Sequence, residues 1–320
     1  MSEIAVKLPP SKPFFSVVIP VHNKVDHLES SLACVYAQTF SDFEIIAVDD
    51  CSTDGSLEIL REHEKAGKLR LYRRSEPGPG GYAARNLGVR KARAEWIVFF
   101  DADDIMHDDH LMVFHDAISE NGRLDFFCNN YVMRVGSKVV GKNKGISSGV
   151  YNKLDGLTFF AQNDFVHMNS ASIRRRLIEK LGGFPEGRYK RGGDVYFWVK
   201  LLADIEAFYY SDMVTSEWLL DNSFVTKNPD NLTVHPLADF IKTERPRLDE
   251  MCDIQLRRII NRKIIAWATE KRLQGRGCYH DFPHVSLKGL GYENMLRLLL
   301  LSMPLSIYHG AITMKRTWRA

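Results

Sequence analysis

The sequence feature that most constrains the fold is the stretch from Trp96 to Asp104, which reads W-I-V-F-F-D-A-D-D. Its first five residues are all apolar and do not alternate with polar ones, which is typical of a strand buried on both faces of a parallel sheet. The run ends at three carboxylates, Asp101, Asp103 and Asp104. Because ligands of open α/β sheets bind beyond the carboxyl ends of the strands, these acids are placed for chemistry.

Asp101 and Asp103 are two residues apart, near enough to share one ligand. Two carboxylates ~4 Å apart repel by roughly 4 kcal/mol at an effective dielectric of ~20, unless water or a cation intervenes. A hard divalent cation with oxygen ligands removes that repulsion and can also hold the phosphates of a substrate. The alternative is a solvated acidic turn that caps the next helix, because short motifs of this kind occur often.

Three strand–helix units precede this stretch. Apolar runs at 16–19, 43–48 and 69–72 predict strands, the first of them closed by Pro20. Apolar residues at helical spacing from Val25 onward, and again after the polar turn at 51–55, predict helices between the strands. This order predicts an α/β fold with a mostly parallel, doubly wound sheet flanked by helices.

Polar groups follow three of the predicted strands, at 20–23, 49–50 and 101–104. Right-handed crossovers bring these strand ends to one edge of the sheet, where a crevice suited to a nucleotide would form. The Gly-rich loop at 78–81 lacks the Walker lysine and the G-x-G-x-x-G order. By itself it fits a plain surface turn as well as a nucleotide site.

Composition narrows the class of protein. The 320 residues fit one large domain or one domain with an appendage. A net charge of +3 from 43 basic and 40 acidic residues gives no reason to expect nucleic acid. Five scattered cysteines without a C-x-x-C pair argue against a zinc cage or a disulfide framework and fit a reducing cytosol. The first fifteen residues have no apolar signal region, and no stretch approaches the ~20 apolar residues of a membrane span.

The second half of the chain has one informative motif. L-G-G-F-P at 181–185 is followed by R-G-G-D-V-Y-F-W at 191–198, so that Asp194 opens an apolar helix after a glycine turn. From these residues alone, Asp194 fits a helix N-cap as readily as a catalytic carboxylate. The basic stretch at 129–149 predicts a surface hairpin or loop, and the arginines at 174–176 predict the start of an exposed helix.

Four motifs together carry a resemblance to a known family. V-V-I-P-V-H-N, I-I-A-V-D-D-C-S-T-D-G-S, A-A-R-N-L-G and F-F-D-A-D-D occur in this order. They resemble the GT-A domain of family 2 glycosyltransferases, inverting enzymes that use nucleotide-sugar donors. The resemblance covers roughly residues 15–225. It implies an N-terminal tail at 1–14, a GT-A domain at 15–238 and a helical C-terminal extension at 239–320.

The resemblance implies roles for the residues at the first three motifs. Pro20 and His22 would line the base pocket, and His22, which replaces the usual tyrosine, keeps a flat ring for stacking. Asp49 would hydrogen-bond the base, which favours uracil, although thymine presents the same edge. Arg85 and Asn86 would lie near the nucleotide.

The acidic motif and Asp194 have implied roles in the reaction itself. Asp101 would contact the ribose or a metal-bound water, and Ala102 would lie at the nucleotide. Asp101 and Asp103 would hold Mn²⁺ or Mg²⁺ at the diphosphate. Asp194 would be the general base, because inversion requires a carboxylate to deprotonate the acceptor hydroxyl as its oxygen attacks the anomeric carbon.

The sequence departs from the family pattern at two places. The acid pair common at the base is reduced to Gly193 followed by Asp194, and Leu220 stands where a metal-binding histidine is common. His235 is a candidate substitute for that histidine, although a surface loop position fits it better. The Q-x-x-R-W signature of processive members is absent, which predicts transfer of one sugar per encounter.

The resemblance fades after about residue 239. Residues 254–273 have helical spacing, and the apolar run at 295–307 contains Arg297, is broken by Pro304 and precedes a basic tail. This end is expected to lie on an anionic membrane surface, to pack on the catalytic domain or to form a homodimer contact. The expected location is cytoplasmic, with peripheral membrane contact as one of these alternatives.

The sequence thus predicts a metal-dependent, inverting, non-processive glycosyltransferase. Its donor is expected to be a nucleotide-sugar, with a UDP-sugar favoured, and its acceptor a glycan or a lipid-linked glycan. Two alternatives stay open. F-F-D-A-D-D-I also resembles the motif of haloacid-dehalogenase-type sugar phosphatases, and the departures near Asp194 and Leu220 fit a non-catalytic sugar-nucleotide binding protein.

Overall fold

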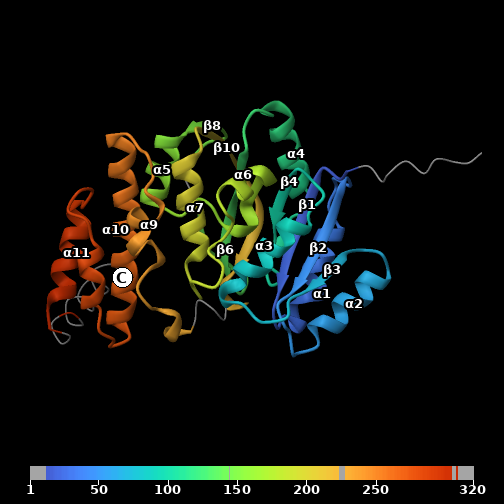
Figure 1. The fold of residues 1–320 in the computed structure, drawn as a ribbon, viewed down its shortest axis with the longest axis horizontal. Helices are drawn as coiled ribbons and strands as arrows, with labels where there is room; N and C mark the ends of the chain where they lie inside the picture. The colour runs from blue at the N-terminus through green and yellow to red at the C-terminus, as the bar shows by residue number, and fades with distance from the viewer. Residues whose placement is uncertain (1–11, 144, 223–227, 305–307, 309–320) are drawn as a thin grey trace, which may run out of the picture.

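The computed structural model describes residues 12–143, 145–222, 228–304 and 308 (Figure 1). Its strands are β1 (Phe15–Val21), β2 (Phe43–Asp49), β3 (Arg70–Arg73), β4 (Trp96–Phe99), β5 (Ile105–Met106), β6 (Phe126–Val135), β7 (Lys138–Lys142), β8 (Gly149–Asn152), β9 (Ala171–Arg174) and β10 (Ala207–Leu219). Its α-helices are α1 (Val25–Tyr36), α2 (Ser56–Lys65), α3 (Tyr82–Lys91), α4 (His110–Glu120), α5 (Lys153–Gln162), α6 (Arg175–Lys180), α7 (Gly193–Asp204), α9 (Phe240–Glu244), α10 (Glu250–Leu273) and α11 (Tyr292–Ser302).

Short 3₁₀ turns link these elements. They are η1 (Pro79–Gly81), η2 (Met168–Ser170), η3 (Leu220–Asn222), η4 (Pro229–Asn231), η5 (Pro236–Asp239) and η6 (Tyr279–His284). The predicted order of strand and helix through the first hundred residues is confirmed, with η1 and α3 following the Gly-rich loop.

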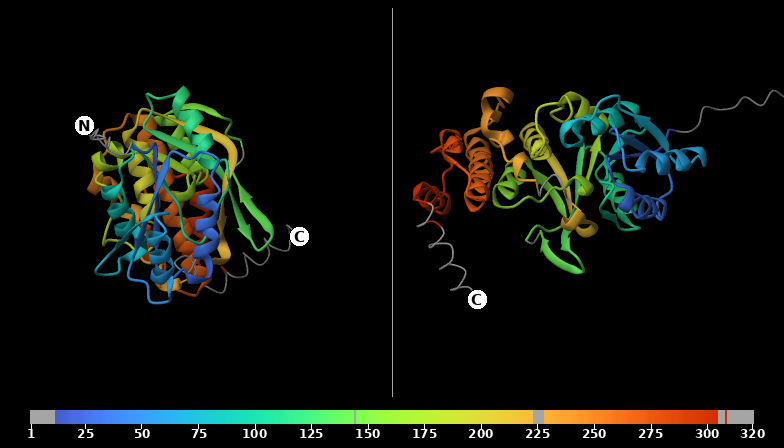
Figure 2. Two further views of the ribbon diagram at one scale, coloured as in Figure 1. Left: turned by 90° about the vertical axis from the view of Figure 1, so that its right-hand side faces the viewer. Right: turned by 90° about the horizontal axis from the view of Figure 1, so that it is seen from below.

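One mixed sheet runs through the molecule, with helices on both of its faces (Figures 1 and 2). Its main strand order is β3-β2-β1-β4-β9-β6-β10-β5, with β7 paired to β6 and β8 paired to β10. The strands β3, β2, β1 and β4 are parallel, whereas β9 is antiparallel to both β4 and β6. The parallel half is the predicted doubly wound unit, and the antiparallel pairings begin only after the acidic motif.

The first strand continues one residue beyond the predicted end at Pro20. Pro20 pairs with Val48, and Val21 pairs with Asp49. The Val18 carbonyl faces β4 and accepts the hydrogen bond from Phe100 N, so the proline nitrogen two residues later faces the same side. Because the pairing with β4 ends at Val18 and Phe99, the missing N–H of Pro20 costs no bond within the sheet.

Alternate residues of the parallel strands enter two separate cores. Val18 and Ile46 face the core that also contains residues of α3, α5, α7 and α10. Val17 and Ile45 face the core under α1, α2 and α4. The continuous apolar runs of the sequence are explained by this arrangement, because strands covered on both faces need apolar side chains at every position.

The C-terminal helices are attached in two ways. Leu256, Ile259, Ile260 and Ile264 of α10 belong to the same core as Phe160 and Trp198, so this core extends across the predicted boundary at residue 238. The next helix, α11, meets α10 in a smaller cluster around Ile265 and Leu301. It ends at Ser302, before Pro304, and residues 305–307 of the predicted apolar run lie outside the described residues.

Two further expectations concern the surface. The basic stretch after Asn129 forms the exposed β6–β7 hairpin, and the arginine run leads into α6, which begins at Arg175. None of the helices within the described residues has the length and apolar character needed to cross a membrane.

Candidate functional site

A cavity of about 570 Å³ opens where the carboxyl ends of the parallel strands meet. Its wall includes the turn after β1, the end of β2, η1 and the start of α3. It also includes the acidic turn after β4, which is residues 101–104, and the start of α7. The predicted site residues that line the cavity are Pro20, His22, Arg85, Asp101, Ala102, Asp103 and Asp194. The predicted convergence of the three strand ends is therefore present in the structure.

The turn after β1 meets the end of β2 at one side of the cavity. His22 is exposed, and its Nδ1 lies 2.7 Å from the backbone oxygen of Asp50. The carboxylate of Asp50 accepts hydrogen bonds from Arg74 and from the Gly78 amide. These contacts tie the Gly-rich loop to the end of β2 beside the ring of His22.

Asp49, the predicted base contact, has a different position from Asp50. Its side chain is fully buried, accepts a hydrogen bond from Ser52 N and has its other oxygen 3.3 Å from Arg73 Nε. The wall is lined by Asp50 and not by Asp49. Successive side chains of a strand point to opposite sides, which is why only one of the two acids reaches the cavity.

Arg85 and Asn86 of α3 also separate. Arg85 is 7% exposed, and its guanidinium pairs with the Asp101 carboxylate and donates to the Gly80 carbonyl at 3.2 Å. Asn86 does not line the cavity; its amide bonds Phe184 through both backbone groups, at 2.9 and 3.0 Å. Neighbouring residues on a helix point about 100° apart, so Arg85 faces the cavity while Asn86 braces the G-G-F loop.

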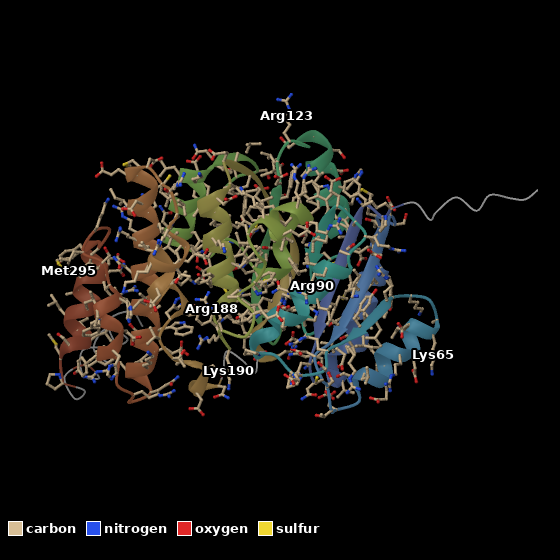
Figure 3. The ribbon with its side chains drawn as sticks, viewed as in Figure 1. Lys65, Arg90, Arg123, Arg188, Lys190 and Met295 are labelled. Atoms are coloured by element: carbon tan, nitrogen blue, oxygen red, sulfur yellow. The ribbon has the colours of Figure 1, made fainter. Side chains whose placement is uncertain are left out.

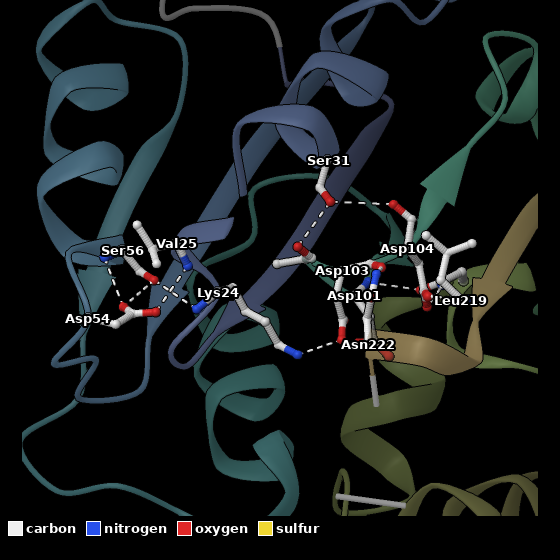
Figure 4. Close-up of polar contacts among 12 residues, drawn as sticks. Lys24, Val25, Ser31, Asp54, Ser56, Asp101, Asp103, Asp104, Leu219 and Asn222 are labelled. Atoms are coloured by element: carbon white, nitrogen blue, oxygen red, sulfur yellow. Dashed lines mark hydrogen bonds and ion pairs between the residues drawn. The ribbon is translucent and has the colours of Figure 1, made fainter. Parts of the chain in front are cut away.

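The acidic turn after β4 takes part in two ion pairs, of which Figure 4 shows the one between Lys24 and Asp103. Asp101 pairs with Arg85, and Asp103 pairs with Lys24 from the turn after β1, at 2.5 Å. Burial alone would raise the pKa of Asp101, but Arg85, His167 and Lys24 hold it below its usual value. Burial raises the pKa of Asp103, with a further contribution from Asp101, although Lys24 opposes the shift.

Asp104 is the most buried acid of the turn, with 4% of its surface exposed. It accepts hydrogen bonds from Asn169 Nδ2 at 2.6 Å and from the Leu219 amide at 2.8 Å. Burial, together with the charges of Asp103 and Asp101, raises its pKa well above the usual value. Three carboxylates crowded in a site of this kind favour the binding of a cation.

A group able to hold a divalent cation is present beside the turn. Among the described residues, Asp101, Asp104 and His167 each offer a ligand atom, and these atoms all lie within 4.8 Å of one another. Burial lowers the pKa of His167, which keeps its imidazole in the neutral form that binds metals. Two carboxylates and one imidazole are a donor set that suits Mn²⁺ and is compatible with Mg²⁺.

The other predicted metal ligands lie near or outside this group. Asp103 lines the same cavity, but Lys24 occupies its carboxylate. His235, the candidate replacement for a histidine near Leu220, is 2% exposed and packs against Trp267. Its Nδ1 accepts from the Leu237 amide at the start of η5. The surface loop position favoured from the sequence is therefore wrong, and His235 is not part of the cation-binding group among the described residues.

Asp194 lies in the first turn of α7 and lines the same cavity as the acidic turn. The residue before the helix, Gly192, has a φ of 80°, a conformation that glycine adopts without strain. Gly193 donates from its amide to the Tyr82 hydroxyl at 2.9 Å, and a Cβ here would lie 2.7 Å from the Tyr82 ring. An acid at position 193 would therefore clash with Tyr82, which accounts for the single carboxylate at this site.

The sequence interpretation missed several residues of the wall, of which Asp50, Asp104 and His167 are the most important. Asp50 and Asp104 adjoin predicted acids, so the motif identified the place but not which side chain faces the cavity. His167 precedes η2, far from the acidic turn in sequence, and stacks on Trp218 at 4.8 Å. No local pattern marks it, and only the pairing of β9 with β4 brings it close.

Comparison with known proteins places the sequence among glycosyltransferases. The model of the family described as Glycosyl transferase family 2 matches residues 16–182. An uncharacterized glycosyltransferase of Rickettsia felis is 35% identical over 106 residues, which are 33% of this chain and 17% of that protein. The putative teichuronic acid biosynthesis glycosyltransferase TuaG of Bacillus subtilis is 36% identical over 100 residues, 31% of this chain and 40% of TuaG. The matched segments thus span less than half of either relative.

A similar fold occurs in a solved structure. The crystal structure of S. aureus TarS 1–349 in complex with UDP-GlcNAc superposes with a TM-score of 0.69 at 21% sequence identity. The match covers 84% of this chain and 78% of the TarS chain. It extends the likeness beyond residue 182 to most of the chain and supports the GT-A fold.

Proposed function

The chain belongs to glycosyl transferase family 2, and on that basis we propose that it transfers one sugar per encounter from a nucleotide-sugar to a glycan or lipid-linked glycan. The observation that carries the proposal is the shared cavity, which Asp194, the acidic turn and His167 of the cation-binding group all line. UDP-GlcNAc bound to TarS, which has the same fold, supports a UDP-sugar as donor. The name of TuaG supports an acceptor among cell-envelope polysaccharides.

In the proposed donor complex, the base lies between Pro20, His22 and Asp50. The exposed imidazole of His22 offers a flat face for stacking, and Asp50, which the structure brings to the wall in place of Asp49, offers a hydrogen-bond acceptor for uracil. Arg85 and Ala102 border the sugar–diphosphate part of the donor. We keep Asn86 in a supporting role, because its amide holds the G-G-F loop that leads toward Asp194.

We place Mn²⁺ or Mg²⁺ at Asp101, Asp104 and His167, and Asp103 stays a predicted ligand that Lys24 would have to release. When bound there, the cation would neutralise negative charge on the departing nucleoside diphosphate. Asp194 accepts the proton of the acceptor hydroxyl while the oxygen of that hydroxyl forms the new bond to the anomeric carbon. The bond from that carbon to the diphosphate oxygen breaks on the opposite face, which inverts the configuration.

The replacement Asp194→Asn tests the base directly. It removes the proton acceptor but keeps the shape of the side chain, so we expect a loss of about 10²–10⁴-fold in kcat for sugar transfer. Binding of UDP with Mn²⁺, followed by calorimetry, is expected to change little. The matched control is Asp204→Asn at the other end of α7, where the carboxylate pairs with Lys180.

Each contrary outcome identifies a different failure. Undiminished transfer by Asp194→Asn would remove Asp194 as the base. If the wild-type protein bound UDP but transferred no sugar from any UDP- or GDP-sugar tested, the chain would be a sugar-nucleotide binding protein. Phosphate release from sugar phosphates without any nucleotide would instead favour the phosphatase alternative.

A further inference from the structure

Tyr82, the first residue of α3, lies between the Gly-rich loop and the turn before α7, and all three line the cavity. Only 4% of its surface is exposed. A Cβ on Gly80 would lie 2.3 Å from Cε2 of the Tyr82 ring, and a Cβ on Gly193 would lie 2.7 Å from its Cζ. The ring therefore occupies a slot that side chains at these two positions would fill.

The slot is closed by further contacts. The Cβ on Gly80 would also lie 2.7 Å from the backbone oxygen of Lys190, so the segment before α7 meets the Gly-rich loop directly. Figure 3 labels Lys190, which in that view lies between α3 and α10. Phe184 of the G-G-F loop stacks beside Tyr82, with the ring centroids 6.3 Å apart. Close packing on these sides leaves the Tyr82 ring little room to move.

The hydroxyl of Tyr82 lies at the start of α7. Amides in the first turn of a helix lack a partner within that helix, and Gly192, the residue before α7, has no side chain that could cap them. Gly193 N donates a hydrogen bond to the Tyr82 hydroxyl at 2.9 Å. Because Asp194 is the next residue, this bond fixes the backbone one residue before the proposed base.

The charge of Asp194 reaches the same hydroxyl. Burial raises the pKa of the Tyr82 hydroxyl, and the charge of Asp194 raises it further, so the hydroxyl stays neutral and able to accept the bond from Gly193. Within the part of the chain that the structure describes, no side chain donates a hydrogen bond to the Asp194 carboxylate. The backbone at the start of α7 is therefore what sets the place of this carboxylate.

We propose that Tyr82 is a positioning residue for sugar transfer. Its hydroxyl holds the first turn of α7 and thereby keeps the Asp194 carboxylate where it can accept the proton of the acceptor hydroxyl. The inference rests on the proposed function, because it gives Tyr82 a part in that reaction, but it needs no contact between Tyr82 and the substrate. Misplacing a reacting group by about 1 Å can lower a rate by about 10²-fold, so the loss of one positioning bond is measurable.

The replacement Tyr82→Phe removes only the hydroxyl and leaves the ring in its slot. We expect kcat for sugar transfer to fall at least about tenfold, while KM for the donor and the affinity for UDP with Mn²⁺ change by less than about twofold. In the background of Asp194→Asn, Tyr82→Phe should cause little further loss, because both changes act through one carboxylate. The matched control is Tyr196→Phe, which removes from the same helix a hydroxyl that donates to Glu244 and should keep the kcat of the wild type.

Amide hydrogen exchange in the full chain measures the same contact without any substrate. Loss of one hydrogen bond should speed exchange of the Gly193 amide by about two- to tenfold, whereas Tyr196→Phe should leave it unchanged. The melting temperature of Tyr82→Phe is expected to fall only slightly, because the ring and its packing stay. This measurement tests the contact even if sugar transfer is slow.

Three results would overturn the inference: a kcat of Tyr82→Phe equal to that of the wild type, a further loss of the same size when Tyr82→Phe is added to Asp194→Asn, or unchanged exchange at Gly193. Failure of the proposed function has a different signature. The wild-type protein would then transfer no sugar while exchange at Gly193 still responded to Tyr82→Phe. In that case the part of Tyr82 in the reaction falls as well, and only its contact with α7 stands.

Discussion

At the residue scale, only one side chain of each of two adjacent pairs lines the cavity. Asp50 lines the wall while Asp49 is buried behind it, and Arg85 lines it while Asn86 braces a loop. The charges of the groups that line the cavity partly neutralise one another, since Arg85 forms an ion pair with Asp101. A change at such a position alters the charge balance of the cavity as well as a single contact.

His167 is the residue whose proposed role is easiest to isolate. We expect His167→Gln to lower the affinity for Mn²⁺, measured by calorimetry in the presence of UDP, by at least about tenfold, because one of three ligand atoms is lost. The control His115→Gln changes an imidazole on α4 that is outside the group and should leave Mn²⁺ affinity unchanged. Equal Mn²⁺ affinity in wild type and His167→Gln would place the cation elsewhere.

His110 should make the stability of the protein depend on pH. It is fully buried at the first position of α4, with Nδ1 2.7 Å from the Thr215 hydroxyl. Burial lowers its pKa from 6.5 to about 3. The unfolded chain therefore takes up a proton below pH 6.5 while the native His110 stays neutral, so the stability present above that pH is lost as the pH falls.

The size of this effect follows from one linked proton. Each pH unit below the unfolded pKa removes up to ~1.4 kcal/mol of unfolding free energy. His110→Gln should lower stability at neutral pH but flatten the slope between roughly pH 6 and 4 by that amount. Urea unfolding at several pH values measures both slopes, and parallel curves for the two proteins would contradict the prediction.

At the scale of secondary-structure elements, α10 is tied to the end of α5 by ion pairs as well as by apolar packing. Asp164, just after α5, accepts from both Arg262 and Lys263 of α10. Burial alone would raise the pKa of the Asp164 carboxyl, but the two cations hold it at about 2. The backbone oxygen of Asp164 also accepts from the Tyr131 hydroxyl at 2.8 Å, and the ring of Tyr131 lies 5.2 Å from His167.

Lys263→Met should therefore loosen the contact between α10 and α5. Because the Asp164 side chain is 37% exposed, water screens part of the ion pair, and we expect a loss of about 1–2 kcal/mol in unfolding free energy. A double-mutant cycle with Asp164→Asn, measured by chemical denaturation, isolates the pair. A coupling energy of zero would show that the pair between Lys263 and Asp164 does not help to hold α10.

At the scale of the whole molecule, the predicted boundary at residue 238 has a testable consequence. A chain ending there would lose Leu256, Ile259, Ile260 and Ile264 from the main core. At ~1.5–3 kcal/mol for each buried side chain, the loss is on the order of 10 kcal/mol, comparable to the whole stability of a typical domain. We expect residues 1–238 to be insoluble or only partly folded, as judged by expression yield and circular dichroism.

A chain ending at residue 290 is the control for this truncation. It keeps α10 and the main core and removes α11, which belongs to the smaller cluster. We expect it to stay folded with a modestly lower melting temperature. If instead residues 1–238 melted cooperatively like the full chain, the C-terminal helices would be an independent appendage.

The sequence by itself determined the parallel half of the fold and the place of the site. Continuous apolar runs predict strands covered on both faces, and the polar residues after them must meet at one sheet edge because the crossovers are right-handed. These patterns are local, so β1, β2 and β4 and the acidic turn could all be located from short segments. The motifs in their order also sufficed to indicate the family.

Only the tertiary structure decided which side chains face the cavity and which distant ones join them. The choice of Asp50 over Asp49 depends on the register and twist of β2 against β1. His167 lies beside Asp104 because β9 pairs antiparallel with β4. Residues of α10 belong to the main core because this helix packs against α5. These are contacts between segments far apart in sequence, and their free energy comes from burial and pairing that no local pattern records.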